Sequence, residues 1–549
     1  MKRVIVIGGG VTGVGILRDL ALRGVPATLL EREDLASGAS GRNQGLLHSG
    51  GRYAVTDPVS ARECIEENAV LRRIAPWAVE ACGGLFVQLR RDDPDYARKW
   101  LTACRVAGIP AEEIAPTEAR SLEPALSDGV VRAFRSPDAG IDPFRLVTAT
   151  AAAAQALGAE VRTGVSVTDL VTDSDRVRTV RAVDCASGDE LLFESELVIN
   201  VAGAWAGNIA AMAGIRLNVV ADRGALIVFN GRLSERVVNR LRFPGDADIL
   251  VPVGTASILG TTAVKTADPD DHTVPAAEVE HILRLGAEMM PAVLWARRLR
   301  AFAGVRPLFD SKVGSSRGSG VETRGISRNF AVLDHSARDG LRGIISVVGG
   351  KLTTHRLMAE KAVDLVLKHL GTAVPCRTAT EPILPYCDNT LAGRVEAALG
   401  KARGERVIER QLCRLGALGK GLAEAEGRLV LCECEDVTAA EVVETVRELG
   451  QGDLSKLRRR TRLGMGTCQG AFCGYRAAGL LHAKGILTLD SAQKSLRRFL
   501  DERWQGSRPV LGGDQLREAE LAYGIYTCNL AFGPSTSGGR GEGVGKEGP

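Results

Sequence analysis

The chain has 549 residues, a formal net charge of +4 at pH 7, 45% hydrophobic residues and 25% charged residues. This length is too great for one compact core, so roughly three or four folding units are expected. The small net charge argues against nucleic acid or an anionic membrane as the main partner. No apolar stretch approaches the roughly 18 residues that cross a bilayer, so we expect no transmembrane segment.

A β-α-β unit opens the chain. Residues 3–7 are a short β-branched run, residues 11–23 carry apolar side chains at helical spacing, and a second strand ends at Glu31. Between strand and helix lies the pattern G-x-G-x-x-G, whose bare positions let a pyrophosphate approach the helix N-terminus. Its glycines are Gly8, Gly10 and Gly13. With Glu31 placed to bind ribose hydroxyls, the unit predicts a dinucleotide site. The alternative is a tight glycine turn beside a solvated carboxylate.

The middle of the chain alternates loops, helices and strands. A loop of small residues at 34–53 is typical of a segment that wraps a ligand, and an amphipathic helix pattern follows at 58–73. Further patterns indicate strands at 161–170, 176–183, 190–200, 248–253 and 257–262, and a helix near 275–290. The segment after residue 200 returns to the nucleotide-binding sheet, whereas residues from about 205 to 310 indicate a separate sheet-bearing lobe.

A late strand leads through Gly349 and Gly350 into a long helix. A helix N-terminus at this point would stabilise negative charge near the pyrimidine edge of a reduced flavin. A nicotinamide enzyme has less need of such a feature. The pattern therefore favours FAD over NAD.

The predicted fold class is α/β with α+β elements. We expect a Rossmann-like FAD-binding domain, an interleaved sheet-bearing substrate domain and a small helical four-cysteine domain. The oxidoreductase part is expected at 1–365, with the FAD-binding lobe at about 1–80, 145–205 and 325–365 and the substrate lobe at about 81–144 and 206–324. A helical connector (366–427), the four-cysteine domain (428–485), a C-terminal helical segment (486–531) and a disordered tail (532–549) complete the chain.

Four of the twelve cysteines form two close pairs. They are Cys432, Cys434, Cys468 and Cys473. The other eight have no ligand spacing, and disulfides are not expected because there is no secretory signal. Most of them are expected to be small buried fillers. Four thiolates bind either an iron–sulfur cluster or zinc. Zinc pairs are more often spaced by two to four residues, so the C-x-C pair favours a cluster, with zinc and free structural cysteines as the alternatives.

These segments together resemble the FAD-dependent glycerol-3-phosphate dehydrogenases of the D-amino-acid-oxidase-like superfamily. The resemblance rests on "VIGGGVTGVGILRDLALRG", "GASGRNQGLLHSGGRYAVTDP", "NVAGAW", "AGVRPL" and "GGKLTTHRLMAE". The trailing "CECEDVTAAEV" and "RRRTRLGMGTCQGAFC" narrow it to the large subunit of the anaerobic type, with a bacterioferritin-associated-ferredoxin-like (BFD-like) [2Fe–2S] domain. It implies oxidation of sn-glycerol 3-phosphate to dihydroxyacetone phosphate by hydride transfer to FAD. It also implies partner flavin or iron–sulfur subunits that pass electrons to a quinone, in the cytoplasm at the inner face of the membrane.

The resemblance also implies roles for individual residues. Arg52 and Arg306 would bind the phosphate, with Tyr53 as a further donor. Lys351 and Thr354 would lie beside the reacting carbon. His48 is our first candidate for the base, because its unperturbed pKa is suitable, and Lys351 is the alternative. The residues expected to contact the cofactor are Gly8, Gly10, Gly13, Glu31, Ser40, Gly203, Trp205, Gly349 and Gly350.

Two positions and two other functions stay open at this stage. His355 stands where the family more often carries tyrosine, so it either lines the pocket or packs behind the loop. The basic run Arg458, Arg459, Arg460 and Arg462 offsets cluster charge, docks an acidic partner or is a solvated face. One alternative function is an oxidase or dehydrogenase of another 2-hydroxy or 2-amino acid. The other is a non-catalytic flavin-binding scaffold or redox sensor with a four-cysteine zinc site.

Overall fold

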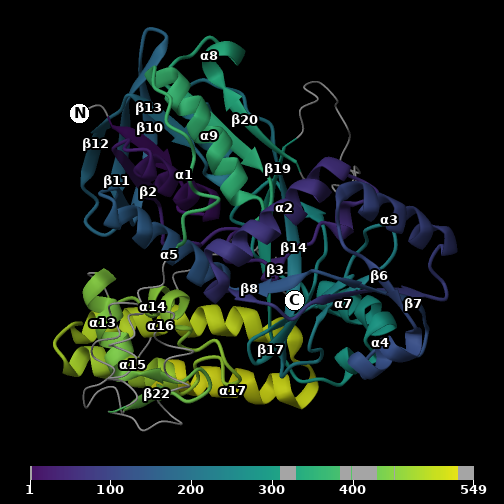
Figure 1. Ribbon diagram of the computed structural model, residues 1–549. Helices are drawn as coiled ribbons and strands as arrows, with labels where there is room; N and C mark the ends of the chain where they lie inside the picture. The colour runs from purple at the N-terminus through teal and green to yellow at the C-terminus, as the bar shows by residue number, and fades with distance from the viewer. Residues whose placement is uncertain (1–2, 310–328, 384–396, 398–428, 450–451, 530–549) are drawn as a thin grey trace, which may run out of the picture.

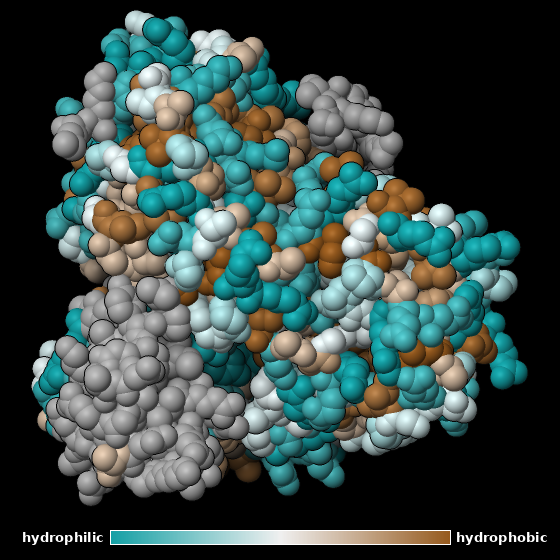
Figure 2. Space-filling model, viewed as in Figure 1, coloured by the Kyte–Doolittle hydropathy of each residue, from teal (hydrophilic) through white to brown (hydrophobic). Residues whose placement is uncertain are grey.

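The computed structural model describes residues 3–309, 329–383, 397, 429–449 and 452–529. Most of the expected connector (366–427) and the expected disordered tail (532–549) lie outside the described residues. Within that part of the chain, no helix is both long and apolar enough to cross a membrane. Hydrophilic side chains cover most of the face drawn in Figure 2, with hydrophobic residues interspersed among them.

A six-stranded sheet positions the nucleotide motif. Its order is β20-β21-β13-β1-β2-β9, parallel except for the β20–β21 pair. The strands are β1 (Val4–Ile7), β2 (Ala27–Glu31), β9 (Glu160–Thr163), β13 (Leu197–Asn200), β20 (Phe330–Asp334) and β21 (Ile344–Gly349). Because parallel strands are covered on both faces, β1 is hydrophobic at every position and fully buried.

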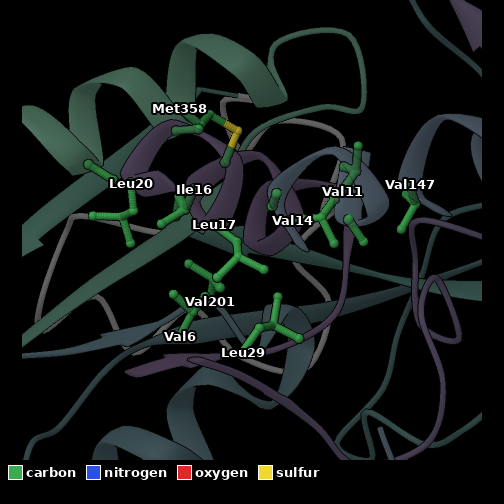
Figure 3. Packing of buried hydrophobic residues seen from close by; sticks show 14 of the residues in the cluster. Val6, Val11, Val14, Ile16, Leu17, Leu20, Leu29, Val147, Val201 and Met358 are labelled. Carbon is green, nitrogen blue, oxygen red and sulfur yellow. The ribbon is translucent and has the colours of Figure 1, made fainter. Parts of the chain in front are cut away.

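Three helices cover one face of this sheet. They are α1 (Val11–Leu22), α5 (Pro143–Ala156) and α9 (His355–Leu370). Figure 3 shows Leu17 of α1 close to Val6 and Leu29 of the strands, with Met358 of α9 on the far side of α1. The other face packs against a three-stranded antiparallel sheet and a short helix, α6 (Ala206–Met212). That small sheet consists of β10 (Val165–Asp173), β11 (Arg176–Asp184) and β12 (Glu190–Glu194).

A nine-stranded sheet forms the second lobe. Its order is β18-β14-β17-β16-β15-β5-β7-β6, and β19 pairs with β14 off this path. The long central pair is β14 (Val219–Asn230) and β19 (Arg298–Phe309); the other strands are β5 (Gly84–Leu89), β6 (Glu112–Ile114), β7 (Val130–Ser136), β15 (Val237–Arg240), β16 (Ile249–Val253), β17 (Ala256–Gly260) and β18 (Val264–Lys265). Around this sheet lie α2 (Pro58–Ile74), α3 (Pro94–Ala107), α4 (Pro116–Leu122) and α7 (Ala276–Met289). The predicted fold class is confirmed by these layers.

Two of the predicted strand ranges are each divided in the structure. Residues 161–170 cover parts of β9 and β10, and residues 190–200 cover β12 and β13. In both cases the two strands belong to different sheets. Gly164, with φ +77°, makes the first break. Alternation of apolar residues continues across such a turn, so periodicity alone does not reveal it.

The cysteine-rich end is a compact unit of short strands and helices. It contains β22 (Val430–Cys432), β23 (Val437–Thr438), α13 (Ala439–Leu449), α14 (Leu454–Thr461) and α15 (Cys473–Ala483). Two longer helices follow, α16 (Leu489–Ser507) and α17 (Gly513–Asn529), and the whole unit lies below the two lobes in Figure 1. Between α16 and α17, Val510 is 4% exposed and belongs to the hydrophobic core of the nine-stranded sheet.

Ion pairs of the basic run attach this unit to the nucleotide-binding lobe. Arg460 makes a two-pronged contact with the fully buried carboxylate of Asp34, at 2.6 and 2.7 Å, and Arg459 lies 3.6 Å from it. Arg462 lies 3.4 Å from Asp142, at the N-terminus of α5. Arg458 also pairs with Glu502, at 3.5 Å, so all four arginines of the run are partnered within the chain and the hypothesis of a solvated face is wrong.

The contact with Asp34 leads to a stability prediction. Replacing Arg460 by Ala leaves a buried carboxylate with only its longer contact to Arg459, so we expect unfolding to become easier by about 3 kcal/mol. Urea unfolding followed by circular dichroism measures this change. Arg98→Ala is the control, because the Arg98–Asp95 pair is exposed and such pairs contribute about 0–1 kcal/mol. Equal losses in the two variants would contradict the role of the Asp34 contact.

Candidate active site and cluster site

A cavity of about 960 Å³ opens at the carboxyl ends of the parallel strands, between the two large sheets. This is the edge at which open α/β sheets bind their ligands. Most of the predicted site residues line it: Gly8, Gly10, Glu31, Ser40, His48, Arg52, Tyr53, Gly203, Trp205, Arg306, Gly349, Gly350 and Lys351. They come from segments far apart in the sequence, which the fold brings together.

The glycine turn after β1 forms a cradle that only glycine permits. A Cβ added at Gly13 would lie 1.9 Å from the carbonyl oxygen of Gly8, which itself has φ +121°. Gly13 therefore does not line the cavity but lets α1 start close to β1. Ser40 Oγ accepts a hydrogen bond from the amide of Val11 at 2.9 Å, at the first turn of α1. The cradle leaves a helix N-terminus facing open space, which fits a pyrophosphate.

Glu31 is held in place at the end of β2. Its two carboxylate oxygens accept backbone N–H groups, from Gly9 at 2.7 Å and from Glu33 at 2.8 Å. Burial raises the pKa of this carboxyl, while the two backbone hydrogen bonds act in the opposite direction. A carboxylate fixed at this end of β2 and beside the glycine turn fits ribose hydroxyls. The cavity, the cradle and Glu31 together have the form that FAD needs.

Trp205 stands at another wall of the same cavity. Its indole N–H donates to Asp270 at 3.0 Å, and the guanidinium of Arg32 lies 5.0 Å from its ring centre. Gly38 permits the close approach, because a Cβ there would lie 3.3 Å from the ring. The tryptophan is therefore fixed from three sides next to the loop that follows Glu31.

Two arginines line the cavity, Arg306 from the second lobe and Arg52 from the loop at 34–53, and each is held by a fully buried aspartate of the second lobe. Arg306 on β19 pairs with Asp222 at 2.6 Å, the residue directly opposite it on β14. It also donates to Thr261, and Gly224 leaves room for its guanidinium. Arg52 lies 3.3 Å from Asp248, and it donates to a backbone carbonyl at 3.0 Å. A guanidinium has five N–H donors, so both keep donors for an anion.

His48, Tyr53 and Lys351 form a group beside these arginines. The rings of His48 and Tyr53 lie 5.3 Å apart, and Lys351 Nζ is 4.8 Å from the centre of the Tyr53 ring. The backbone N–H of His48 donates to Thr353 Oγ1 at 3.2 Å, which ties this loop to the turn after β21. An imidazole, a phenol and an ammonium group thus meet where the two loops join.

The glycine pair after β21 turns the chain sharply before α9. Gly349 and Gly350 have φ of +78° and +80°, and a Cβ at Gly350 would lie 2.3 Å from Met358 Sδ. The helix begins at His355, so residues 351–354 form a turn in front of it. Thr354 is buried and does not line the cavity; its hydroxyl accepts the N–H of Lys351 at 3.3 Å.

His355 packs behind the loop and does not line the cavity. Its Nδ1 lies 2.8 Å from the carbonyl oxygen of Leu352, and its ring rests against Gly15 of α1. Burial lowers the pKa of this imidazole to about 4. A neutral histidine in this position supports the turn. Of the two hypotheses for His355, the one in which it packs behind the loop is confirmed.

Several cavity residues escaped the sequence reasoning. Arg42, Asn43 and Gln44 line the cavity within a segment whose resemblance was noted but whose side chains were not assigned. His272 also lines it; burial lowers its pKa to about 4, and its Nδ1 has no hydrogen-bond partner within the described part of the chain. The run of polar side chains at 42–44 was the available signal, whereas nothing in the sequence around His272 indicates a site.

The four cysteines of the C-terminal unit interact through their thiols. Cys473 makes side-chain hydrogen bonds with Cys432 and Cys468, and Cys434 makes one with Cys468. The bond to Cys473 lowers the pKa of Cys432 to about 7 and that of Cys468 to about 5. Neither at these cysteines nor elsewhere among the described residues do three or more His, Cys, Asp or Glu side chains form a group that could hold a metal ion.

The surroundings of the thiols fit a binuclear cluster. Backbone N–H groups of Gly464 and Glu435 bond to the Cys432 sulfur, and those of Gly470 and Phe472 bond to the Cys468 sulfur. Backbone donors of this kind tune iron–sulfur clusters held by four cysteines. Gly466 is also required, because a Cβ there would lie 2.3 Å from Cys434 Cβ. The donor set and its backbone cradle therefore match a [2Fe–2S] cluster.

Comparison with known proteins agrees with this geometry. Residues 3–356 match the family model of FAD dependent oxidoreductases, and residues 430–483 match that of the BFD-like [2Fe-2S] binding domain. The glycerol-3-phosphate dehydrogenase of Bacillus halodurans, solved with FAD, has the same fold, with a TM-score of 0.67 and 19% identity over 93% of this chain and 96% of that one. The protein is thus an FAD dependent oxidoreductase that carries a BFD-like [2Fe–2S] binding domain.

Closer relatives define the family more narrowly. The A subunit of anaerobic glycerol-3-phosphate dehydrogenase from Escherichia coli K12 is 44% identical over 96% of this chain and 97% of its own length. The A1 subunit of the enzyme of the same name from Haloferax volcanii is 42% identical over 96% of this chain and 90% of its own. The chain belongs to the family of anaerobic glycerol-3-phosphate dehydrogenase A subunits. The predictions of this family, of FAD and of a [2Fe–2S] domain are confirmed.

The glycine cradle gives a direct test of cofactor binding. Gly13→Ala would place a methyl group against the Gly8 carbonyl, so α1 must move away from β1. We expect the affinity for FAD to fall at least about tenfold. Fluorescence titration of the apoprotein with FAD measures the change. Gly479→Ala is the matched control, since nothing lies within 4 Å of a Cβ there. Unchanged affinity in Gly13→Ala would contradict the proposed site.

Proposed function

We propose that the protein oxidises sn-glycerol 3-phosphate to dihydroxyacetone phosphate and passes the electrons to partner subunits that reduce a quinone. The observation that carries this proposal is the pair of arginines fixed by buried aspartates at the flavin cavity. The reaction named for the relatives has a phosphate monoester as substrate, and such a group requires fixed positive charge.

The arginine pair suits a phosphate. Because Asp222 and Asp248 each fix one prong of a guanidinium, Arg306 and Arg52 lose little side-chain freedom when an anion binds. Lys351 adds a third positive charge to the lining of the same cavity. We propose that these three side chains and the Tyr53 hydroxyl hold the phosphate and orient the secondary alcohol towards the flavin.

Removal of a proton is the remaining chemical requirement. Bound FAD would take a hydride from the carbinol carbon, and the hydroxyl proton must then leave to a base. We propose His48 for this role, because it lies at the same wall as Tyr53 and Lys351. Lys351 is the alternative base. Thr354 holds the turn that carries Lys351, so its role is to position that side chain.

The remaining assignments follow the same reasoning. Gly8, Gly10, Glu31 and Ser40 would hold the adenosine diphosphate part of FAD, and Gly203, Trp205, Gly349 and Gly350 would complete the cofactor site. Gly13 would act indirectly, by letting α1 start close to β1. The four cysteines would ligate the cluster, which takes electrons singly. We further propose that residues 1–365 act as the oxidoreductase, and that partner subunits attach the assembly to the cytoplasmic face of the membrane.

The substrate assignment is tested by anaerobic stopped-flow mixing of the FAD-loaded protein with sn-glycerol 3-phosphate. We expect Arg306→Gln to raise the half-saturating substrate concentration by about 10- to 100-fold, since a charged hydrogen-bond donor is lost. Arg284→Gln, an exposed arginine of α7, is the control. Glycerol and a 2-hydroxy acid serve as comparison substrates. Faster flavin reduction by the 2-hydroxy acid would overturn the substrate, and normal saturation of Arg306→Gln would overturn the phosphate site.

The base is tested in the same experiment. His48→Asn should slow flavin reduction at saturating substrate by roughly 100-fold or more, while substrate saturation changes little. Lys351→Met is the companion variant. If Lys351→Met alone shows the large loss in rate and His48→Asn reduces the flavin normally, the base is Lys351 and our first assignment fails.

A further inference from the structure

A second cavity lies where the cysteine-rich unit meets both lobes. Its volume is about 180 Å³, which leaves room for several water molecules but not for a dinucleotide. One wall is the loop at residues 41–45, another is formed by β14, β17 and β19, and the third by α14 and the segment around Met465 and Gln469. Three parts of the chain that are remote in sequence thus enclose one space.

Positive charge dominates this cavity. Five arginines line it against two carboxylates: Arg42, Arg300, Arg458, Arg459 and Arg462 against Asp142 and Glu502. Three of the arginines have carboxylate partners, namely Arg458 with Glu502, Arg459 with Asp34, and Arg462 with Asp142 and Glu435.

The other two arginines have no carboxylate within ion-pair distance among the described residues. Arg42 donates to the backbone carbonyl of Ser37. The guanidinium of Arg300 lies 5.8 Å from the Phe302 ring centre, and its Nε has no hydrogen-bond acceptor among the described residues. Burial lowers the pKa of the Arg42 guanidinium; the carboxylate of Glu502 acts in the opposite direction, and the neighbouring Arg459 lowers the pKa further. These two half-buried guanidinium groups without a carboxylate partner favour an anion in the cavity.

A buried hydroxyl provides a second, independent indication. Ser455 lies at the first turn of α14 and lines the cavity, with 7% of its surface exposed. Its Oγ has no hydrogen-bond partner among the residues that the structure describes. Buried hydroxyl groups in proteins are nearly always bonded, so this hydroxyl calls for a water molecule or a ligand in the cavity.

We propose that this interdomain cavity binds a small phosphate dianion, either inorganic phosphate or the phosphate group of a small ester. The anion would take N–H groups from Arg42 and Arg300 of the two lobes and from Arg458 of the cysteine-rich unit, and the hydroxyl of Ser455. It would therefore link the unit that carries the four cysteines to the lobes that form the flavin cavity. The two cavities adjoin and share Ser37 and residues 42–44, but Arg300, Arg458 and Ser455 line only the smaller one.

The test is equilibrium dialysis of the full-length, FAD-loaded protein with radiolabelled inorganic phosphate. The measurement is made in the Arg306→Gln background, which weakens phosphate binding at the substrate cavity. We expect one phosphate per chain in that background. Adding Arg458→Gln or Arg300→Gln should weaken this binding at least about tenfold. The control substitution, Arg447→Gln, changes an exposed arginine of α13 and should leave the binding unchanged.

If an arginine variant does not fold, a smaller substitution at the same cavity still tests phosphate binding. Ser455→Ala removes only the hydroxyl, and we expect about threefold to tenfold weaker phosphate binding. Phosphate should also raise the unfolding temperature of the parent protein more than that of Ser455→Ala. No bound phosphate in the Arg306→Gln background, or equal affinity in Ser455→Ala, Arg300→Gln and the control, would overturn the proposal.

Competition with unlabelled sn-glycerol 3-phosphate identifies the occupant. Displacement at concentrations similar to those of inorganic phosphate would show that the site accepts a small ester, whereas weak displacement would assign it to inorganic phosphate. Failure of this proposal can be told apart from failure of the proposed function. Phosphate binding in this cavity is measured by dialysis, whereas substrate oxidation is measured by flavin reduction.

Discussion

The buried carboxylate of Asp34 is the contact on which the arrangement of the two functional parts depends. It lies three residues after Glu31, which is fixed by the glycine turn, and its two oxygens bind Arg460 of α14. The segment from Glu31 to Gly45 therefore faces the flavin cavity on one side and the cysteine-rich unit on the other. A shift of this loop would disturb the cofactor cradle and the attachment of the cluster domain together.

The substrate side depends on a different constraint, which is strand register. Asp222 and Arg306 stand directly opposite each other on β14 and β19, so a register slip would separate the carboxylate from the guanidinium. Gly224 and Gly304 leave the space that the Arg306 guanidinium and the Arg42 backbone occupy. The long antiparallel pair thus positions a charged group at the flavin cavity with the precision that a loop alone would not provide.

Local features of the sequence predicted the parts of the fold that depend on local chemistry. The glycine turn, the strand that ends at Glu31 and the helix of α1 followed from residue type and spacing. The partners of Arg52 and Arg306 did not, because Asp248 and Asp222 are chosen by sheet pairing between distant strands. The direction of the Thr354 side chain and the intrachain partners of the basic run likewise depend on tertiary contacts, and so does the placement of His272 in the cavity.

The central claim is that one chain couples oxidation of the phosphate ester at the flavin to the [2Fe–2S] cluster through the docked C-terminal unit. The most direct measurement is rapid freezing of the anaerobic protein after mixing with sn-glycerol 3-phosphate, without partner subunits, followed by electron paramagnetic resonance. The account predicts that the signal of a reduced [2Fe–2S] cluster grows as the flavin absorption falls. A fully bleached flavin beside a cluster that stays oxidised would contradict it.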